Sequence, residues 1–246
     1  MVEWMEEQEF RDRADQALDA LYRRLSTAAE EFDFEADFNS GALAIEFESP
    51  PGKFVTMLSA PQLWLLGLFQ MATFGMSVVV GSWVVVLLVK GMKVPVTRAG
   101  MIGSLVLLLG IVSRPLGGML RQHIGIRPLF AGSLVTISLG CFLLLPSSIS
   151  LIVALTAVVL IGIGVGIPYA AMFSRAAKLF PGRAAAAMGF VNMLGIIMIL
   201  GGAPLVGHLA DLTGSFKTSF AVLGGFSLVT CAAIPLLDRE DPAQRA

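Results

Sequence analysis

The residues of this sequence that could do chemistry are a few polar side chains set among long apolar segments. Arg114, Gln122, His123 and Arg127 lie within residues 113–128, a short stretch that is too polar for lipid and too short for a domain. Cationic and amide side chains of this kind suit hydrogen bonds and ion pairs between helix ends. The sequence contains no Walker loop, no dinucleotide fingerprint after a strand, no His/Cys metal spacing and no Ser–His–Asp set. We therefore predict that the protein is not an enzyme.

Other polar side chains fall inside the apolar segments themselves. Gln70, Tyr169 and Asn192 are the candidates for substrate contact, because a polar group in hydrocarbon needs a partner or a wet cavity. Hydrogen bonding between helices explains the two amides about as well as substrate contact does. Arg114 also has two interpretations, since its guanidinium can snorkel to the membrane interface or make a gating contact.

The elements that hold these residues follow from an uneven distribution of charge. Residues 1–56 carry 14 of the 18 acidic residues and 5 of the 17 basic ones, whereas residues 57–246 carry the other 4 acids and 12 bases. Between Met57 and Leu237 the only acid is Asp211. A surface in contact with lipid must exclude carboxylates in this way, whereas a water-facing surface need not. We predict an acidic head over residues 1–56 and a membrane part over residues 57–246.

The membrane part contains six apolar segments, each compared with the roughly 20 residues needed to cross a bilayer. Their approximate bounds are 63–89, 99–119, 128–145, 149–173, 184–207 and 219–237. Pro168 and Pro204 lie inside two of these segments and predict kinks there. The predicted fold class is a mainly α, polytopic membrane protein with six transmembrane helices, preceded by a small α+β fragment.

The six segments also show an internal repeat. Gly118 and Gly207 are 89 positions apart, and so are Gly125 and Gly214. A fixed offset that covers three hydrophobic segments predicts a 3+3 inverted repeat.

The spacing of these glycines carries a resemblance to a known family. Gly118, position 122, His123, Gly125 and Arg127 fall on G-x-x-x-[D]-[RK]-x-G-x-[RK], which resembles the signature loop of major facilitator superfamily (MFS) transporters. A second copy contains Gly207, Asp211 and Gly214. Residues 168–183 and 189–207 are similar to the tenth and eleventh helices of that family. The resemblance covers about residues 60–240 and implies the C-terminal six-helix half of a transporter.

In the family this loop acts as a conformational latch, so the resemblance implies that a set of residues takes part in gating. These residues are Arg114, Gly118, Gln122, His123, Gly125, Arg127, Gly207, Asp211 and Gly214. The sequence departs from the pattern at Gln122, where the family has an acid that pairs with basic residues. Asp211 keeps the acid in the second copy, with His208 and Lys217 as possible partners, although a helix cap explains Asp211 as well.

In the acidic head, apolar residues at three- and four-residue steps predict a helix from about residue 6 to 29. Alternating apolar and acidic residues then predict two strands, over residues 32–38 and 43–47, joined by a three-residue turn at Asn39–Gly41. This order resembles the start of frataxin, called CyaY in bacteria, over residues 5–55. The resemblance implies weak iron binding by Glu31, Asp33, Glu35 and Asp37 and a role in iron–sulfur cluster assembly. The carboxylates are equally typical of a solvated face.

The leading hypothesis is transport of a small solute by one transporter half, which needs a homodimer or a second six-helix bundle as its opposing wall. The alternatives are an iron-binding adaptor tethered to the membrane and an inactive fusion of two truncated parents. We predict no cofactor beyond iron on the head, no nucleic acid partner, and the lipid bilayer as surroundings.

Lys and Arg counts in the short loops predict an inner (cytoplasmic) membrane protein with both termini in the cytoplasm. The cytoplasmic side would carry Lys53, Arg121, Arg127, Arg175, Lys178, Arg183, Arg239 and Arg245. The opposite side would carry Lys90, Lys93, Arg98 and Lys217. The substrate, the coupling ion and the direction of transport do not follow from the sequence.

Overall fold

A computed structural model describes residues 13–24, 35–39, 42–46, 57–146 and 150–237 of the chain. The chain divides into two compact units, Met1–Ser59 and Ala60–Ala246. Each unit is described here by itself.

The first unit contains one helix and one hairpin among its described residues. Residues 13–24 are helical, inside the range that the apolar periodicity predicts. Strand β1 (Glu35–Asn39) pairs antiparallel with β2 (Ala42–Glu46), and Asn39 lies opposite Ala42. Only two residues therefore separate the strands, and the predicted three-residue turn is wrong because Asn39 belongs to the ladder.

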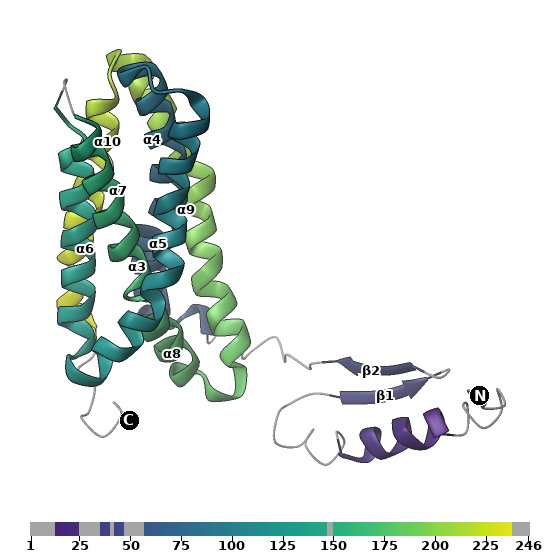
Figure 1. The fold of residues 1–246 in the computed structure, drawn as a ribbon. Coiled ribbons are helices and arrows are strands. Elements are labelled where there is room, and N and C mark those ends of the chain that lie inside the picture. Colours follow the sequence, from purple (N-terminus) through teal and green to yellow (C-terminus); the bar gives the residue numbers. More distant parts are fainter. Residues whose placement is uncertain (1–12, 25–34, 40–41, 47–56, 147–149, 238–246) are drawn as a thin grey trace, which may run out of the picture. The chain divides into compact units, whose positions relative to one another are not determined.

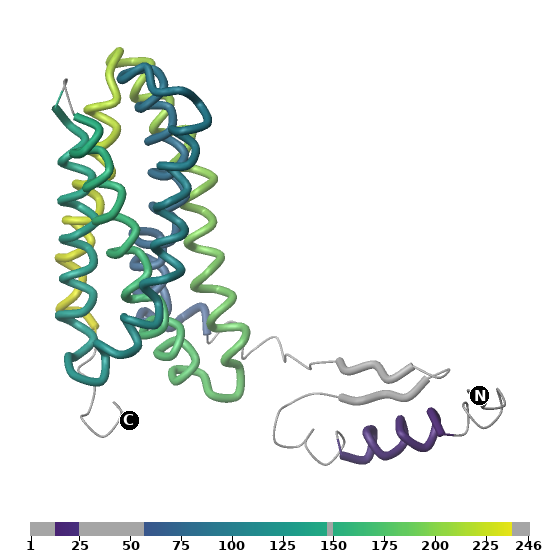
Figure 2. Tube along the Cα trace, in the orientation of Figure 1, coloured from purple at the N-terminus to yellow at the C-terminus, as the bar shows by residue number. Residues whose placement is uncertain are grey.

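The second unit is a bundle of six helical spans, several of them interrupted (Figures 1 and 2). The first span comprises α3 (Pro61–Gln70), the π-helical turn η1 (Met71–Gly75) and α4 (Met76–Met92). The second and third spans are α5 (Val96–His123) and α6 (Ile126–Leu143). The fourth comprises α7 (Leu151–Gly166) and α8 (Tyr169–Leu179). After a 3₁₀ turn, η2 (Pro181–Arg183), come α9 (Ala184–Thr213), α10 (Phe216–Cys231) and the 3₁₀ turn η3 (Ile234–Leu236).

All six predicted segments are confirmed as helices that are long and apolar enough to cross a membrane. The two predicted kinks behave differently. Pro168 separates α7 from α8, whereas α9 continues through Pro204. The second span is longer than predicted, because the polar residues after 119 prolong α5 to His123.

The ends of the helices have local causes. Ser150 and Ser215 cap α7 and α10, where their hydroxyl oxygens accept hydrogen bonds from the backbone N–H groups of Val153 and Lys217. At the C-terminal end of α9, Gly214 has φ of 63°, a left-handed conformation that favours glycine. Its place in the second copy of the loop motif is thus explained by backbone geometry.

The bundle is held together where helix backbones approach closely. A side chain at Gly117 of α5 would overlap the carbonyl group of Ile167, next to the end of α7. Buried serines reinforce such crossings by donating to glycine carbonyls on neighbouring helices. Ser133 bonds Gly164, and Ser138 bonds Gly224 at 2.8 Å. Small residues and hydroxyls of this kind stabilise helix pairs in lipid, where apolar side chains gain little by clustering.

Helices α5 and α9 correspond to each other in several respects. They have 28 and 30 residues, and each contains one interior proline. Pro115 and Pro204 are 89 positions apart, the same offset as the glycines of the two loops. Both helices also bury only 28% of their most apolar 18 residues, the lowest share among the six spans. Their outward faces are therefore apolar and uncovered.

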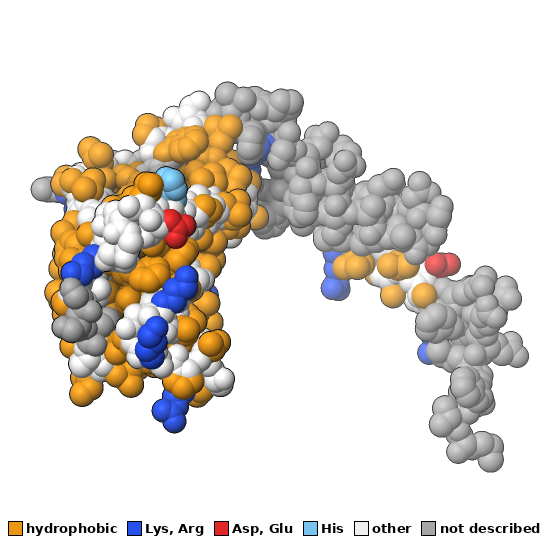
Figure 3. Space-filling view, turned by 90° about the horizontal axis from the view of Figure 1, so that it is seen from above, with side chains coloured by type: hydrophobic (Ala, Val, Ile, Leu, Met, Phe, Trp, Pro, Cys, Tyr) orange, Lys and Arg blue, Asp and Glu red, His pale blue; other side chains and the backbone are white. Residues whose placement is uncertain are grey.

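One end of the bundle is visible in Figure 3, where hydrophobic side chains cover much of the six-helix unit and Lys and Arg side chains occur at scattered points. Such a surface matches lipid surroundings with charges near the ends of the helices. Together with the six spans, it identifies this unit as a multi-pass membrane domain.

Candidate functional site

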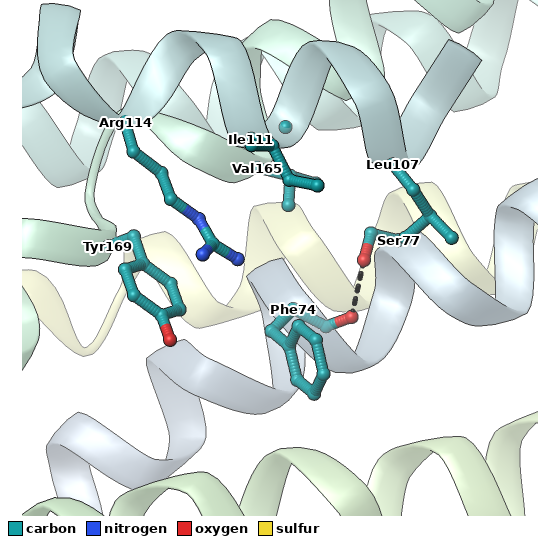
Figure 4. Close-up of a pocket in the computed structure, with 8 residues that line it drawn as sticks. Phe74, Ser77, Leu107, Ile111, Arg114, Val165 and Tyr169 are labelled. Atoms are coloured by element: carbon teal, nitrogen blue, oxygen red, sulfur yellow. Dashed lines mark hydrogen bonds between the residues drawn. The ribbon is translucent and has the colours of Figure 1, made fainter. Parts of the chain in front are cut away.

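A cavity of about 160 Å³ lies between the first, second and fourth spans (Figure 4). Its walls are mostly apolar. The lining residues are Phe74, Ser77, Leu107, Gly110, Ile111, Arg114, Val165 and Tyr169. This volume is well below the 300–1,000 Å³ typical of pockets for drug-sized ligands, so the cavity suits a small solute or ion.

Among the described residues that line this cavity, only Arg114 carries a charge. It lies on α5, nine residues before that helix ends, and its guanidinium carbon is 3.7 Å from the centre of the Tyr169 ring. In Figure 4 the guanidinium points toward the space between Tyr169 and Phe74. Stacking on the ring face is a favourable cation–π contact. Among the described residues, however, none accepts a hydrogen bond from the guanidinium.

The orientation of Arg114 follows from its neighbour Ser113. The Ser113 side chain is buried, and its hydroxyl lies 3.3 Å from the Gly110 carbonyl oxygen and 3.5 Å from that of Gly162 on α7. Gly166, also on α7, has no room for a side chain against Ser113. This tight crossing fixes the rotation of α5, and the next side chain along the helix therefore faces the cavity.

Tyr169 reaches the cavity because the fourth span breaks just before it. Helix α7 ends at Gly166, and Tyr169 is the first residue of α8, after Pro168. The sequence predicts Tyr169 as a substrate candidate and Arg114 as a gating residue. The structure brings the two side chains together, although they are 55 positions apart in the chain.

The first span contributes Phe74 and Ser77 to the cavity wall. Phe74 lies in the π-helical turn η1, and the Ser77 hydroxyl donates a 2.6 Å hydrogen bond to the Phe74 carbonyl oxygen. Turns of this type occur mostly as local widenings of α-helices and are frequent at functional sites. The sequence gives no signal for Phe74, because a wide turn without proline has no distinctive residue pattern.

The side chains that line this cavity suit binding of a ligand. Its lining contains no carboxylate, imidazole or thiol. Elsewhere in the described part of the chain, no three His, Cys, Asp or Glu side chains gather as they would around a metal ion. A guanidinium with free N–H groups and an aromatic partner is suited to hold an anion.

Gln70 and Asn192 lie outside the lining of this cavity and bind each other. The Gln70 amide nitrogen donates a 3.2 Å hydrogen bond to the Asn192 side-chain oxygen, across 122 positions of sequence. Gln70 is fully buried, and its own amide oxygen has no hydrogen-bond partner among the described residues. Of the two interpretations that the sequence left open, the structure displays interhelical bonding. Substrate contact by this pair stays a prediction.

Residues of the first loop motif make mainly structural contacts within the six-helix bundle. Arg127 donates hydrogen bonds from its guanidinium to the carbonyl oxygens of Pro235, at 2.9 Å, and Leu237, at 3.1 Å from Nε. It thereby fastens the start of α6 to the end of the sixth span. The Nδ1 atom of His123 lies 3.1 Å from the Met119 carbonyl oxygen in its own helix. Gln122 is exposed, and Gly125 is the N-cap residue of α6.

The first glycines of the two motif copies have different surroundings. A side chain on Gly118 would meet no described residue within 4 Å, whereas one on Gly207 would lie 3.0 Å from the Trp83 ring. Asp211 is exposed in the last turn of α9. It does not cap the following helix, because Ser215 is the N-cap of α10. Gating by the motif residues stays a prediction.

The predicted iron ligands are only partly within the described residues. Glu31 and Asp33 lie outside them. Glu35 and Asp37 occupy alternate positions of β1, opposite Glu46 and Ala44. Alternate strand positions share one face. Iron binding on this face stays a prediction.

Two comparisons with known proteins bear on the chain. The sequence model described as Major Facilitator Superfamily matches residues 20–198 and 63–246. A curated relative from Thermus thermophilus, described as probable nitrate/nitrite antiporter NarK1, is 26% identical over 183 residues. The match covers 66% of this chain and 41% of the relative, so the chain spans less than half of the relative's length. The resemblance of the head to frataxin finds no support in these comparisons.

Proposed function

Because the chain belongs to the major facilitator superfamily, we propose that it forms one six-helix half of a secondary transporter for a small inorganic anion, bound by Arg114. The observation that carries this proposal is the guanidinium of Arg114, which is stacked on Tyr169 beside a cavity and has no hydrogen-bond acceptor among the described residues. Transport of solutes across the membrane is the activity of the family. The class of solute is our inference.

The argument for an anion is electrostatic. A guanidinium held among apolar side chains loses most of its hydration, and the loss is offset only when a negative partner makes good hydrogen bonds to it. The only carboxylate between Met57 and Leu237 is Asp211, which lies at the end of α9 and not in the cavity lining. The counter-charge for Arg114 therefore comes from a solute that enters the cavity.

The argument for nitrate or nitrite rests on size, geometry and the named relative. Planar oxyanions accept two parallel hydrogen bonds from the planar fork of an arginine. A cavity of about 160 Å³ accommodates an ion of a few atoms. The relative from Thermus thermophilus is described as a probable nitrate/nitrite antiporter, and we extend that substrate class to this chain.

A second bundle is needed to complete the cavity. Leu107 and Ile111 line it and are also 43% and 57% exposed, which means that α5 forms a wall open to the outside of this bundle. We propose that a second copy of the chain, or a separate six-helix bundle, covers α5 and α9. Transport then proceeds as the two bundles rock about the enclosed anion.

Orientation is proposed from the basic residues at the two ends of the spans. The end that we assign to the cytoplasm carries Arg121, Arg127, Arg175, Lys178 and Arg183, and the other carries Lys90, Lys93, Arg98 and Lys217. Lys53, Arg239 and Arg245, counted on the cytoplasmic side as well, lie outside the described residues. The excess favours an inner-membrane protein with both termini in the cytoplasm.

The test is uptake of labelled nitrate by proteoliposomes that contain the full chain and are loaded with unlabelled nitrate or nitrite. We expect exchange that nitrite inhibits and that urea, a neutral planar molecule of similar size, does not. Exchange of a cation or a neutral solute in place of nitrate would contradict the proposal. Cross-linking in the same vesicles checks the second bundle, since a monomer that exchanges nitrate would contradict that part.

A further inference from the structure

The first span lies along α9 and is anchored to it at two places. In α3, the Trp64 ring packs edge-on against Phe190, with ring centres 5.0 Å apart. In α4, the indole N–H of Trp83 donates a 3.2 Å hydrogen bond to the Ala203 carbonyl oxygen. Helix α9 is continuous over this length, whereas the first span is interrupted between its two anchors. The interruption is the π-helical turn η1.

The Gln70–Asn192 hydrogen bond lies directly at this interruption. Gln70 is the last residue of α3, and η1 begins at the next position. Packing around the amide is tight, because a side chain on Gly195, one turn beyond Asn192, would come within 2.8 Å of the Gln70 Cγ atom. Two helices that touch this closely leave Gln70 few alternative positions.

The turn that follows Gln70 supplies part of the cavity wall. Phe74 belongs to η1, and Ser77 lies in the first turn of α4. Both line the cavity with Arg114. If η1 changed from a π to an α turn, the residues on its two sides would rotate relative to each other, because the two helix types differ in residues per turn. The shape of η1 therefore determines where Phe74 stands.

The amide pair is also incompletely satisfied. The Gln70 amide oxygen is buried and finds no hydrogen-bond partner in the part of the chain that the structure describes. A buried acceptor without a donor disfavours the arrangement that buries it, whereas the hydrogen bond to Asn192 favours it. The two effects oppose each other, and a contact balanced in this way can be released more readily than one in which every group is paired.

We propose that Gln70 and Asn192 are positioning residues: their hydrogen bond holds η1 against α9, so that Phe74 completes the anion cavity beside Arg114. This role requires no contact between either residue and the anion. The effect on binding rests on the proposed function, whereas the effect on the turn does not. The two parts can therefore be tested separately.

The turn is tested by hydrogen–deuterium exchange of the full chain in detergent, with Asn192→Leu compared with the native protein. We expect exchange in residues 71–80 to become about tenfold faster, the effect of losing one hydrogen bond that restrains local opening. Deuterium exchange in α6 should not change. Thr136→Val is the matched control, because the Thr136 hydroxyl bonds only the Gly132 carbonyl of its own helix. Unchanged exchange in residues 71–80 of folded Asn192→Leu would overturn the proposal.

The binding part is tested by the apparent KM and maximal rate of nitrate exchange. Asn192→Leu should raise KM about tenfold, with a smaller change in maximal rate, since the binding wall is displaced while Arg114 is intact. The double variant Gln70→Asn with Asn192→Gln swaps the two side chains. It should restore KM and maximal rate to within about twofold of the native values. Should Asn192→Leu fail to fold, Asn192→Ser takes its place.

The possible outcomes separate the two proposals. If Asn192→Leu speeds deuterium exchange in residues 71–80 but leaves the KM for nitrate unchanged, the positioning role is overturned. If the native chain binds no nitrate, the proposed function fails, and the deuterium measurement by itself still decides whether the pair holds the turn.

Discussion

Helices α5 and α9, the second and fifth of the six spans, are alike in build but differ in what they contact. They have nearly equal length and interior prolines 89 positions apart. The residue before the proline is Arg114 in α5 and Ala203 in α9. Arg114 directs a cation toward the cavity, whereas Ala203 offers its carbonyl oxygen to Trp83 of the first span. In the function proposed above, α5 would meet the solute, whereas α9 holds the helix beside it.

The difference shows that two helices of similar build can make different side-chain contacts at matching positions. Both helices keep the proline and the glycine three residues after it, at Gly118 and Gly207. In α9 the space at this glycine is occupied by Trp83, and in α5 it is empty within this half. A second bundle would have the same access to Gly118 that Trp83 has to Gly207. Function in a shared fold depends in general on the side chains that the scaffold carries.

The largest expected effect comes from replacing Arg114 of α5 with alanine, the residue that α9 has at the matching position, Ala203. Arg114→Ala removes the charge and every N–H donor of the cavity, so the affinity for nitrate should fall about 100-fold or more, as expected for a loss of about 3 kcal/mol from charge-assisted hydrogen bonds. Calorimetric titration of nitrate provides the measurement. Arg98→Ala, at the exposed start of α5, is the matched control and should bind as the native chain does. Equal affinities for the two variants would remove Arg114 from the site.

The next effect separates two adjacent glycines of α5. Gly117→Ala forces a methyl group against the Ile167 carbonyl and should lower the free energy of unfolding by about 2 kcal/mol or more. Gly118→Ala meets no neighbour and should change it by less than about 0.5 kcal/mol. Thermal unfolding in detergent compares the two variants. Similar melting temperatures would mean that α5 and α7 do not cross as closely as described.

A smaller effect tests whether the cavity needs the shape of arginine or only its charge. Arg114→Lys keeps a cation but loses the planar fork and the stacking on Tyr169. Nitrate affinity should fall about tenfold, between the native chain and Arg114→Ala. A lysine variant that binds as tightly as the native protein would show that charge alone suffices.

The smallest effect concerns the contact that distinguishes α9 from α5. Gly207→Ala places a methyl group 3.0 Å from the Trp83 ring, which can shift slightly to accommodate it. We expect a loss of about 1 kcal/mol in unfolding free energy and a change in tryptophan fluorescence. Gly118→Ala is again the control, since it lacks such a neighbour. An unaltered emission spectrum would argue against the close approach of Trp83.

The sequence predicts the six spans well, because lipid excludes charge over a length that composition reveals directly. It predicts their ends less well. Arg121, Gln122 and His123 look like loop residues, but a helix can continue outside the hydrocarbon, and α5 does so. The turn η1 escapes prediction for a different reason. Residues 71–75 contain no proline, and it is their packing against α9 that accompanies the wider turn.

The sequence singles out the polar residues of the candidate site and of the amide pair beside it, but not the apolar lining and not the assembly. Arg114, Tyr169, Gln70 and Asn192 all stand out as polar groups in apolar surroundings. Which of them meet depends on contacts across 55 and 122 positions, and spacing along the chain carries no information about those. The sequence therefore identifies the participants, while the pairing of Arg114 with Tyr169 and of Gln70 with Asn192 requires the fold.

The unequal lengths of the spans bear on the thickness of the bilayer that this protein tolerates. At a rise of 1.5 Å per residue, the 30 residues of α9 extend about 45 Å, whereas the 18 residues of α6 extend about 27 Å. A long helix adapts to hydrocarbon about 30 Å deep by tilting, whereas a short helix requires the bilayer around it to become thinner. Helix α6 thus sets an upper limit on acyl-chain length. Nitrate exchange should therefore slow more in vesicles of longer-chain lipids than in vesicles of shorter-chain lipids.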